Sequence, residues 1–291
     1  MESSRSITSR IADYAQLAKM RLSLLVLFSA VAGFVIASPE QLDWARLIVL
    51  VFGGFLVTAS SNAFNQVLEK DTDKLMDRTA ARPLAAGRMF HTEGFIVASV
   101  MGLAGVSMLA YFLGSLCGFL GLLSLLLYVL AYTPLKKESP FAVFVGAIPG
   151  AMPPLLGWVA ATGTLDFGAW ILYSIQFIWQ FPHFWALAWV LDEDYKKAGF
   201  RMLPSGERNR ASAFQALAYS IGLIPIGFLP FVFNMVSILP TIIIAICSLV
   251  FAWQALSLYR KCTVQAAQRL MYGSFMYLPL VQIALMADRF L

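Results

Sequence analysis

Two long stretches without a charged side chain constrain the fold more than any other feature of the sequence. No Asp, Glu, Lys or Arg occurs from Gly94 to Leu135, or from Ala211 to Tyr259. A single helix over the second stretch would be roughly 70 Å long, more than twice a hydrocarbon core of about 30 Å. Each stretch must therefore fold back once, and the predicted turns are at Gly114-Ser115 and Asn234-Met235.

Shorter apolar stretches complete a set of membrane spans. Nine are predicted, over residues 22–38, 45–64, 94–113, 116–134, 141–161, 167–190, 212–233, 237–258 and 270–288. The chain is 59% hydrophobic and 13% charged, whereas soluble domains carry about 25% charged residues. Continuous apolar runs exclude a closed barrel and predict helices, which satisfy their own backbone hydrogen bonds in lipid. The predicted fold class is an all-α integral membrane protein, a bundle of about nine transmembrane helices.

The basic residues predict the side of the membrane on which each loop lies. With the N-terminal segment 1–20 in the cytoplasm, only Arg46 and Arg289 of the 21 Lys and Arg residues fall outside. This asymmetry follows the positive-inside rule and predicts cytoplasmic motif loops in a bacterial inner membrane. It also accounts for the net charge of +5, so no nucleic-acid partner is expected. Lys19, Arg21 and Ala37 would also fit a signal peptide, whose removal would leave the remaining sidedness unchanged.

The first long inside loop begins with a stripe of polar residues. Asn65, Glu69 and Asp73 are spaced four apart, so on a helix they share one face, about 6 Å apart along the axis. Asp71 lies between them and points elsewhere. Oxygen ligands at this spacing suit Mg²⁺, which prefers one or two carboxylates, retained waters and phosphate oxygens.

Basic residues and a second acid cluster accompany the stripe. Arg78 and Arg82 follow it, again four apart, and guanidinium groups suit phosphate. The second cluster, Asp192 to Asp194, follows the sixth span on the same side of the membrane. Together they predict a magnesium–diphosphate site that favours ionisation of an allylic diphosphate, because cations stabilise the leaving group. The alternative is an interfacial loop whose acids and bases neutralise one another through i,i+4 pairs.

In these stretches the sequence resembles the UbiA-type intramembrane prenyltransferases, whose first motif is Asn-x-x-x-Asp/Glu-x-x-x-Asp, and among them the heme O synthases. The resemblance rests on residues 65–84, 132–163, 179–188 and 194–204, in order and at the family's spacing. It covers most of residues 15–205, and beyond them only hydropathy agrees. Departures include Met20 for a common Pro, Ala142 and Val143 for Asn and Thr, and Leu191 and Tyr195 in the second motif.

The resemblance implies a single prenyltransferase domain over residues 1–291, with a central cavity open to the cytoplasmic side. The implied reaction is Mg²⁺-dependent transfer of a farnesyl group from farnesyl diphosphate to a vinyl group of heme b, giving heme O. Heme b is then a substrate, and a heme A synthase or a terminal oxidase assembly is the expected downstream partner. The implied site residues are Asn65, Glu69, Asp73, Asp194 and, as a secondary candidate, Asp192 for the metal, with Arg78, Arg82, Lys136 and Lys197 for the diphosphate.

His183 is the candidate for the heme side of the reaction. A histidine in an apolar span is costly unless it is paired or ligated, and neutral imidazole is a standard axial ligand of heme iron. The alternative is a structural hydrogen bond to a neighbouring helix.

Two other functions remain open. A UbiA-type enzyme could act on a quinone precursor or a chlorophyllide, although the stretches Arg-Thr-x-x-Arg-Pro (78–83) and Trp-Gln-x-Pro-His (179–183) favour heme. A secondary transporter is the more distant alternative. Transporters place ionisable groups near the bilayer midplane and show inverted repeats, whereas these acids cluster at the cytoplasmic ends of the spans.

Overall fold

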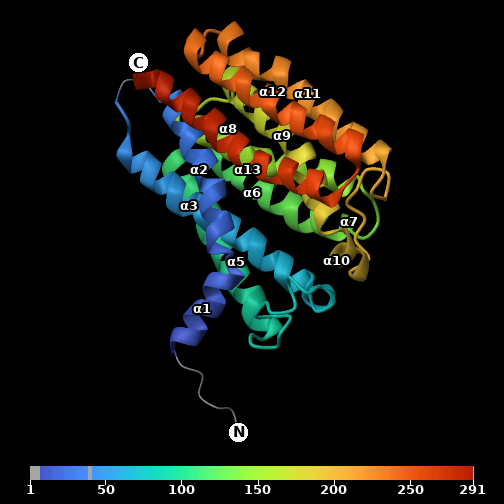
Figure 1. Ribbon diagram of the computed structural model, residues 1–291. Coiled ribbons are helices and arrows are strands. Elements are labelled where there is room, and N and C mark those ends of the chain that lie inside the picture. The colour runs from blue at the N-terminus through green and yellow to red at the C-terminus, as the bar shows by residue number, and fades with distance from the viewer. Residues whose placement is uncertain (1–6, 39–40, 291) are drawn as a thin grey trace.

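The computed structural model describes residues 7–38 and 41–290, and every regular element within them is helical (Figure 1). The elements are α1 (Ile7–Leu17), α2 (Met20–Ala37), α3 (Trp44–Leu68), α4 (Lys70–Asp73), α5 (His91–Leu113), α6 (Ser115–Leu126), η1 (Leu127–Tyr132), α7 (Thr133–Leu135), α8 (Ala142–Thr162), α9 (Phe167–Val190), α10 (Asp192–Lys197), α11 (Arg210–Val232), α12 (Ile238–Lys261), α13 (Val264–Ala287) and η2 (Asp288–Phe290). Of the described helices, eight are long and apolar enough to cross a membrane, with α6, η1 and α7 forming one continuous span. A ninth, α9, is equally long at 24 residues, but buried Gln176, Gln180 and His183 lower its mean hydropathy. In the described chain, eight of the nine predicted spans are thus confirmed as candidate membrane helices, and the ninth is a helix of comparable length.

The predicted turns lie where the two charge-free stretches fold back. Gly114 separates α5 from α6 with a φ of 110°, and Asn234 follows α11 with a φ of 54°. Glycine, and less often asparagine, adopts a positive φ at low cost. At their loop ends, α3 and α13 extend beyond the predicted 45–64 and 270–288, because residues 65–68 and 264–269, which include polar side chains, continue the two helices.

Helix α8 runs through the middle of the bundle and contributes to both large apolar clusters. One cluster joins it to α9, α11, α12 and α13, and the other joins it to α2, α3, α5 and α6. The backbones of α2 and α8 approach closely: a Cβ atom on Gly157 would lie 1.9 Å from Ala30 O, and one on Gly33 would lie 2.0 Å from Pro154 O. Small residues thus allow these two membrane helices to pack tightly.

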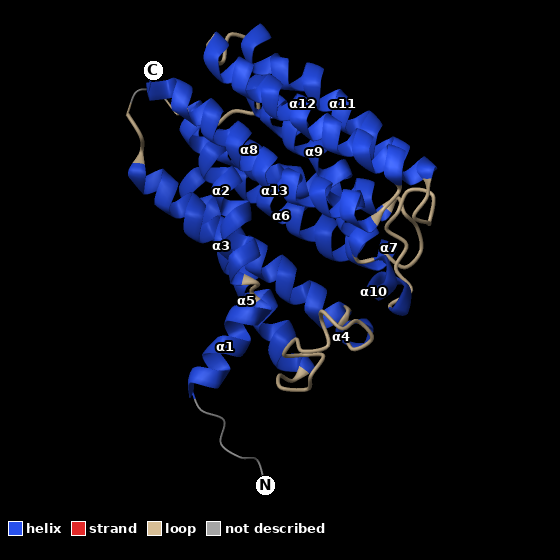
Figure 2. Cartoon of the chain, viewed as in Figure 1, coloured by secondary structure: helices blue, strands red, loops and turns tan. Residues whose placement is uncertain are grey.

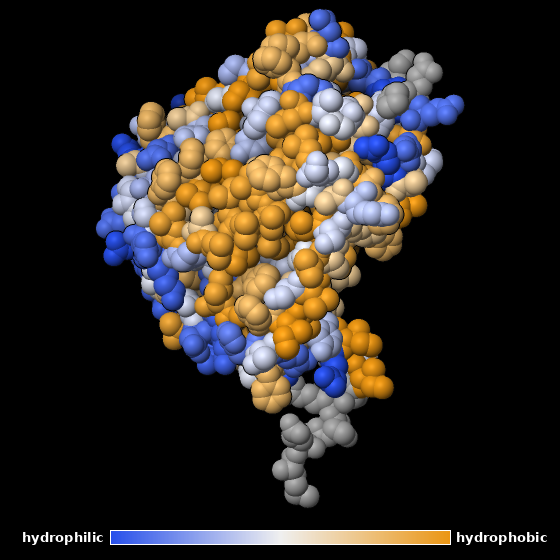
Figure 3. Space-filling view, turned by 180° about the vertical axis from the view of Figure 1, so that it is seen from behind, coloured by the Kyte–Doolittle hydropathy of each residue, from blue (hydrophilic) through white to orange (hydrophobic). Residues whose placement is uncertain are grey.

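Apolar side chains also cover the outside of the bundle (Figure 3). Leu103, Leu130 and Trp253 are among many large apolar residues exposed on different helices. An exposed apolar surface of this extent is unlike that of a soluble monomer, and it fits a multi-pass membrane protein.

The two ends of the bundle differ in their connections. Both long loops, over residues 74–90 and 198–209, lie at the same end (Figure 2). At the other end, Arg46 Nε donates to Ala160 O at the end of α8, and Arg289 donates to Val35 O at the end of α2. The two arginines predicted to lie outside therefore share one end, opposite the acid loops, and the sidedness itself stays a prediction.

Candidate active site

The predicted stripe of Asn65, Glu69 and Asp73 runs along the loop end of α3 and onto α4. Glu69 joins the two helices, with Glu69 N bonding Asn65 O at 2.9 Å and Asp73 N bonding Glu69 O at 2.7 Å. These i,i+4 bonds carry the stripe across the junction. All three residues are buried, with whole-residue exposed fractions of 2%, 5% and 1%. Asp71 instead faces solvent and pairs with Lys74 at 2.7 Å.

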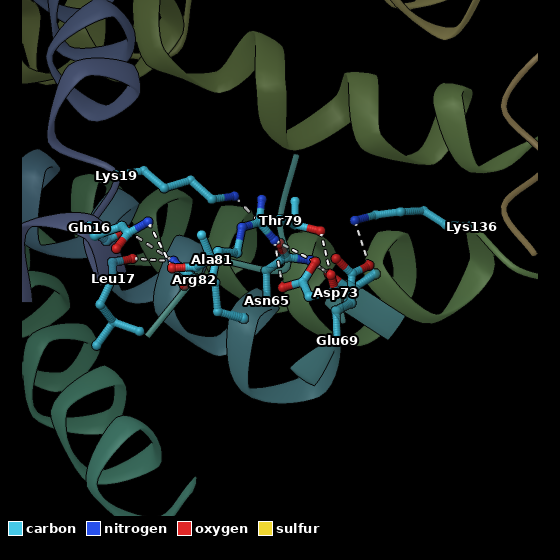
Figure 4. Close-up of polar contacts among 12 residues, drawn as sticks. Gln16, Leu17, Lys19, Asn65, Glu69, Asp73, Thr79, Ala81, Arg82 and Lys136 are labelled. Carbon is cyan, nitrogen blue, oxygen red and sulfur yellow. Dashed lines mark hydrogen bonds and ion pairs between the residues drawn. The ribbon is translucent and has the colours of Figure 1, made fainter. Parts of the chain in front are cut away.

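Both carboxylates of the stripe meet cations from other parts of the chain (Figure 4). Lys136, which follows α7, places Nζ 2.7 Å from Glu69 Oε1. Arg82, in the loop after α4, donates from Nη1 to both carboxylate oxygens of Asp73 at 2.7 Å. Burial raises the pKa of Asp73 above its ordinary value, although the charge and hydrogen bond of Arg82 act in the opposite direction. The stripe is therefore neutralised within the protein itself.

Lys19, between α1 and α2, lies beside the stripe, although the sequence analysis considered it only as an inside charge and as part of a possible signal peptide. Its Nζ lies 3.5 Å from Asn65 Oδ1 (Figure 4). Burial, followed by repulsion from Arg82 and Lys136, lowers the pKa of Lys19 to about 7. The cations gathered here repel one another, so an anion among them would be stabilised.

These groups surround a polar cavity of about 110 Å³ at the loop end of the bundle. It is lined by Lys19, Asn65, Glu69, Asp73, Met76, Arg78, Arg82, Tyr128, Tyr132, Lys136, Tyr195, Phe200 and Met202. The lining of the cavity thus combines basic and acidic side chains with aromatic and methionine side chains. Of the predicted site residues, six line this cavity, and the aromatic lining could not be read from composition because aromatic residues occur throughout the chain.

Local backbone irregularities place Lys136 at the cavity. The π-helical segment η1 and the Pro134-containing turn of α7 come directly before it, and π-helical segments are frequent at functional sites. The Tyr132 ring lies 4.7 Å from Lys136 Nζ. A Cβ atom on Gly146 would lie 2.6 Å from that ring, so glycine leaves the space in which the tyrosine packs. Arg201 N donates to Lys136 O at 2.9 Å, so the loop over residues 198–209 also contacts the chain at Lys136.

The second acid cluster supports the first loop rather than lining the cavity. Asp194 accepts hydrogen bonds from the backbone N–H groups of Asp77 at 3.0 Å and Arg78 at 3.3 Å. Lys197 pairs with Asp77 at 2.7 Å. Asp192 pairs with Lys196 and Arg208, beside its own loop. The metal roles of Asp192 and Asp194 and the diphosphate role of Lys197 therefore stay predictions, and these three side chains lie outside the cavity wall.

The donor set fits Mg²⁺ bound together with a phosphate ligand. In the described part of the chain, no cluster of three or more His, Cys, Asp or Glu side chains could hold a metal ion alone. Glu69, Asp73 and the amide oxygen of Asn65 offer two buried carboxylates and a neutral oxygen. Mg²⁺ commonly takes one or two carboxylates and completes its shell with water and phosphate oxygens.

His183 lies farther along α9 and meets α13. Its Nδ1 is 2.7 Å from Ser274 Oγ, and that hydroxyl donates its own hydrogen to Met271 O. A hydroxyl that donates to Met271 O can accept from Nδ1, so this pattern is compatible with a proton on Nδ1 and a lone pair on Nε2. Trp179 stacks on the ring, with centroids 4.7 Å apart. The predicted structural hydrogen bond exists, and it is compatible with a ligand role for Nε2.

Comparisons with known proteins agree over nearly the whole chain. The sequence profile of the UbiA prenyltransferase family matches residues 26–279. A protoheme IX farnesyltransferase of Cytophaga hutchinsonii is 44% identical over 284 residues, covering 97% of this chain and 99% of the relative. The protoheme IX farnesyltransferase of Christiangramia forsetii is 42% identical, covering 97% of this chain and 95% of the relative.

Solved structures share the fold at low sequence identity. A structure of digeranylgeranylglyceryl phosphate synthase matches with a TM-score of 0.82 and 19% identity, over 97% of this chain and 99% of the other. A UbiA homolog from Archaeoglobus fulgidus bound to GPP and Mg²⁺ matches with a TM-score of 0.73 and 15% identity, over 94% and 99%. On the evidence of the profile and the curated relatives, the chain belongs to the UbiA prenyltransferase family.

Proposed function

We propose that this enzyme transfers a farnesyl group from farnesyl diphosphate to a vinyl group of heme b, giving heme O, in a Mg²⁺-dependent reaction. The observation that carries the proposal is the 44% identity, over nearly the full length of both chains, to a protoheme IX farnesyltransferase. A polar cavity lined by two carboxylate and four basic side chains supports it. These ionisable groups lie at the loop end of the bundle rather than near its middle, which does not favour a transporter.

The cavity residues would promote departure of the diphosphate. Bound Mg²⁺ would supply positive charge to the leaving phosphate oxygens. Glu69 and Asp73 would hold the ion, while Arg82 and Lys136 exchange their carboxylate partners for phosphate oxygens. As the allylic C–O bond breaks, these donors stabilise the negative charge that develops on the diphosphate.

The remaining steps place carbon and oxygen on the vinyl group. The allylic carbon bonds to the terminal vinyl carbon, and a water molecule adds its oxygen to the neighbouring carbon and loses a proton. Tyr128 and Tyr132 present aromatic side chains at the cavity, and aromatic faces stabilise nearby cations. His183, with its Nε2 lone pair, would face the heme.

The sidedness and the fate of the product complete the proposal. The motif loops and the N-terminus would face the cytoplasm of a bacterium, as the positive-inside rule indicates. The product would pass to a heme A synthase or to terminal oxidase assembly.

Heme analysis of membranes tests the proposal. Membranes that express this chain, supplied with heme b and farnesyl diphosphate, should yield a heme heavier by one farnesyl and one hydroxyl group in chromatography and mass spectrometry. Asp73→Asn should abolish this product, whereas Asp71→Asn should not, because Asp71 is exposed and paired with Lys74. Folded protein that yields no new heme would refute the heme acceptor, and quinone precursors and chlorophyllide would then be supplied instead.

A further inference from the structure

The turn between α1 and α2 holds Lys19 in an unusual backbone conformation. Lys19 has φ 47° and ψ 54°, in the left-handed region, which residues other than glycine, asparagine and aspartate adopt uncommonly. Such a conformation persists only where the surroundings hold it, and these positions cluster at functional sites. The neighbouring contacts therefore decide where this lysine points.

Side chains of α3, the helix that carries Asn65, form hydrogen bonds to the chain around this turn. Gln66, fully buried, donates from Nε2 to the carbonyl oxygens of Gln16 at 3.2 Å and Leu17 at 2.8 Å. One turn earlier, Asn62 Nδ2 donates to Ser23 Oγ at 3.2 Å. These two residues flank Asn65 of the stripe on the same helix. The helix that carries the metal candidates therefore also fixes the path of the chain through Lys19.

Held in this way, Lys19 adds a basic side chain to the cavity without a matching acid. Its nearest polar partner is the neutral Asn65 amide at 3.5 Å. Within the described residues no carboxylate forms an ion pair with Lys19, because Glu69 pairs with Lys136 and Asp73 pairs with Arg82. The cavity lining contains four cationic side chains and two carboxylates. A bound anion offsets such an excess of basic over acidic side chains.

We propose that Lys19 contacts a phosphate oxygen of the prenyl diphosphate, and that Gln66 positions it by fixing the α1–α2 turn. The identity of the anion rests on the proposed function. A second source of the same chemistry is a carboxylate on the acceptor, such as a heme propionate. The two sources differ in which ligand loses affinity when the charge is removed.

Binding of inorganic pyrophosphate with Mg²⁺ tests the proposal without the prenyl chain, the acceptor or turnover. Lys19→Met keeps the length of the side chain and removes its charge. In calorimetry on the purified full chain, it should weaken pyrophosphate binding about tenfold or more, since hydrogen bonds to charged groups contribute about this much. Lys19→Arg should restore most of the affinity. Arg21→Met is the matched control, because Arg21 is a nearby exposed basic residue.

Further variants separate the possible results. Gln66→Met should weaken pyrophosphate binding in the same direction but less, and heme binding should be unchanged in both Gln66→Met and Lys19→Met. Unchanged pyrophosphate binding in folded Lys19→Met, judged by its melting temperature, would overturn the proposal. Weaker heme binding with unchanged pyrophosphate binding would also overturn it and assign Lys19 to the acceptor. A wild-type chain that binds pyrophosphate but makes no heme O would refute only the proposed function.

Discussion

Replacing Lys136 with methionine tests whether Glu69 is a metal ligand. In the absence of substrate, the Lys136 ammonium group pairs with this carboxylate and would compete with the metal ion. The two side chains are 10% and 7% exposed, and Lys136 Nζ lies 2.7 Å from Glu69 Oε1. Mg²⁺ that binds Glu69 must displace a charge-assisted hydrogen bond worth about 1.5–3 kcal/mol. The displaced ammonium group then repels the ion, which adds to the cost.

Lys136→Met removes this competition, so two affinities should change in opposite directions. Mg²⁺ alone should bind about 10- to 100-fold more tightly than to the wild-type protein. Pyrophosphate should bind about tenfold more weakly, because the cavity has lost one of its phosphate donors. Loss of the partner of a buried carboxylate should also lower stability by about 3–5 kcal/mol, and added Mg²⁺ should restore part of it.

Calorimetric titration of Mg²⁺ into purified protein measures the change in Mg²⁺ affinity. Thermal unfolding with and without Mg²⁺ measures the loss of stability and its partial recovery. Lys137→Met is the control, because Lys137 adjoins Lys136 in the sequence but is exposed. If Lys136→Met binds Mg²⁺ no more tightly than the wild-type protein, Glu69 is not a metal ligand in competition with Lys136, and the reasoning fails.

Three other substitutions test separate parts of the structure. Gly157→Ala should lower the melting temperature by about 2–10 °C, because a Cβ atom there would lie 1.9 Å from the α2 backbone, whereas Gly222→Ala should not, since no atom lies within 4 Å of the added Cβ. Asp194→Ala should raise the KM for farnesyl diphosphate about 3- to 10-fold and speed amide hydrogen exchange in the first acid loop, two of whose N–H groups it caps. Ser274→Ala should weaken heme binding about tenfold or more and change the Soret band in the same direction as His183→Ala, because it removes the hydrogen-bond partner of His183 Nδ1. An unchanged spectrum in both variants would exclude His183 as an iron ligand.

The spans and their turns could be predicted because they depend on local composition. A charge-free stretch longer than the membrane is thick must fold back, whatever packs against it. Gly114 and Asn234 are residues that tolerate a positive φ, and both adopt one. The Asn65, Glu69 and Asp73 stripe was predictable for the same reason, since helical spacing alone places its members on one face.

The partners of the stripe could not be predicted, because they come from distant parts of the chain. Lys136 is 67 residues from Glu69, and helical spacing says nothing about contacts at that separation. Lys19 enters the cavity only because buried side chains of α3 fix its turn. Asp194 was read as a ligand from its motif, whereas its contacts to the backbone of the first loop depend on how the two loops pack.

The contacts of the first acid loop also separate the two interpretations of its charges. Asp71 and Lys74 form an exposed i,i+3 pair, as expected for a loop that neutralises itself, and such surface pairs contribute about 0–1 kcal/mol. Glu69 and Asp73 instead form buried pairs with Lys136 and Arg82 across the cavity. Buried ion pairs are poor stabilisers, because desolvation offsets their attraction. The proposed function gives them a different role: when a magnesium diphosphate binds, the carboxylates would exchange their cationic partners for the metal, and Lys136 and Arg82 would gain the phosphate oxygens.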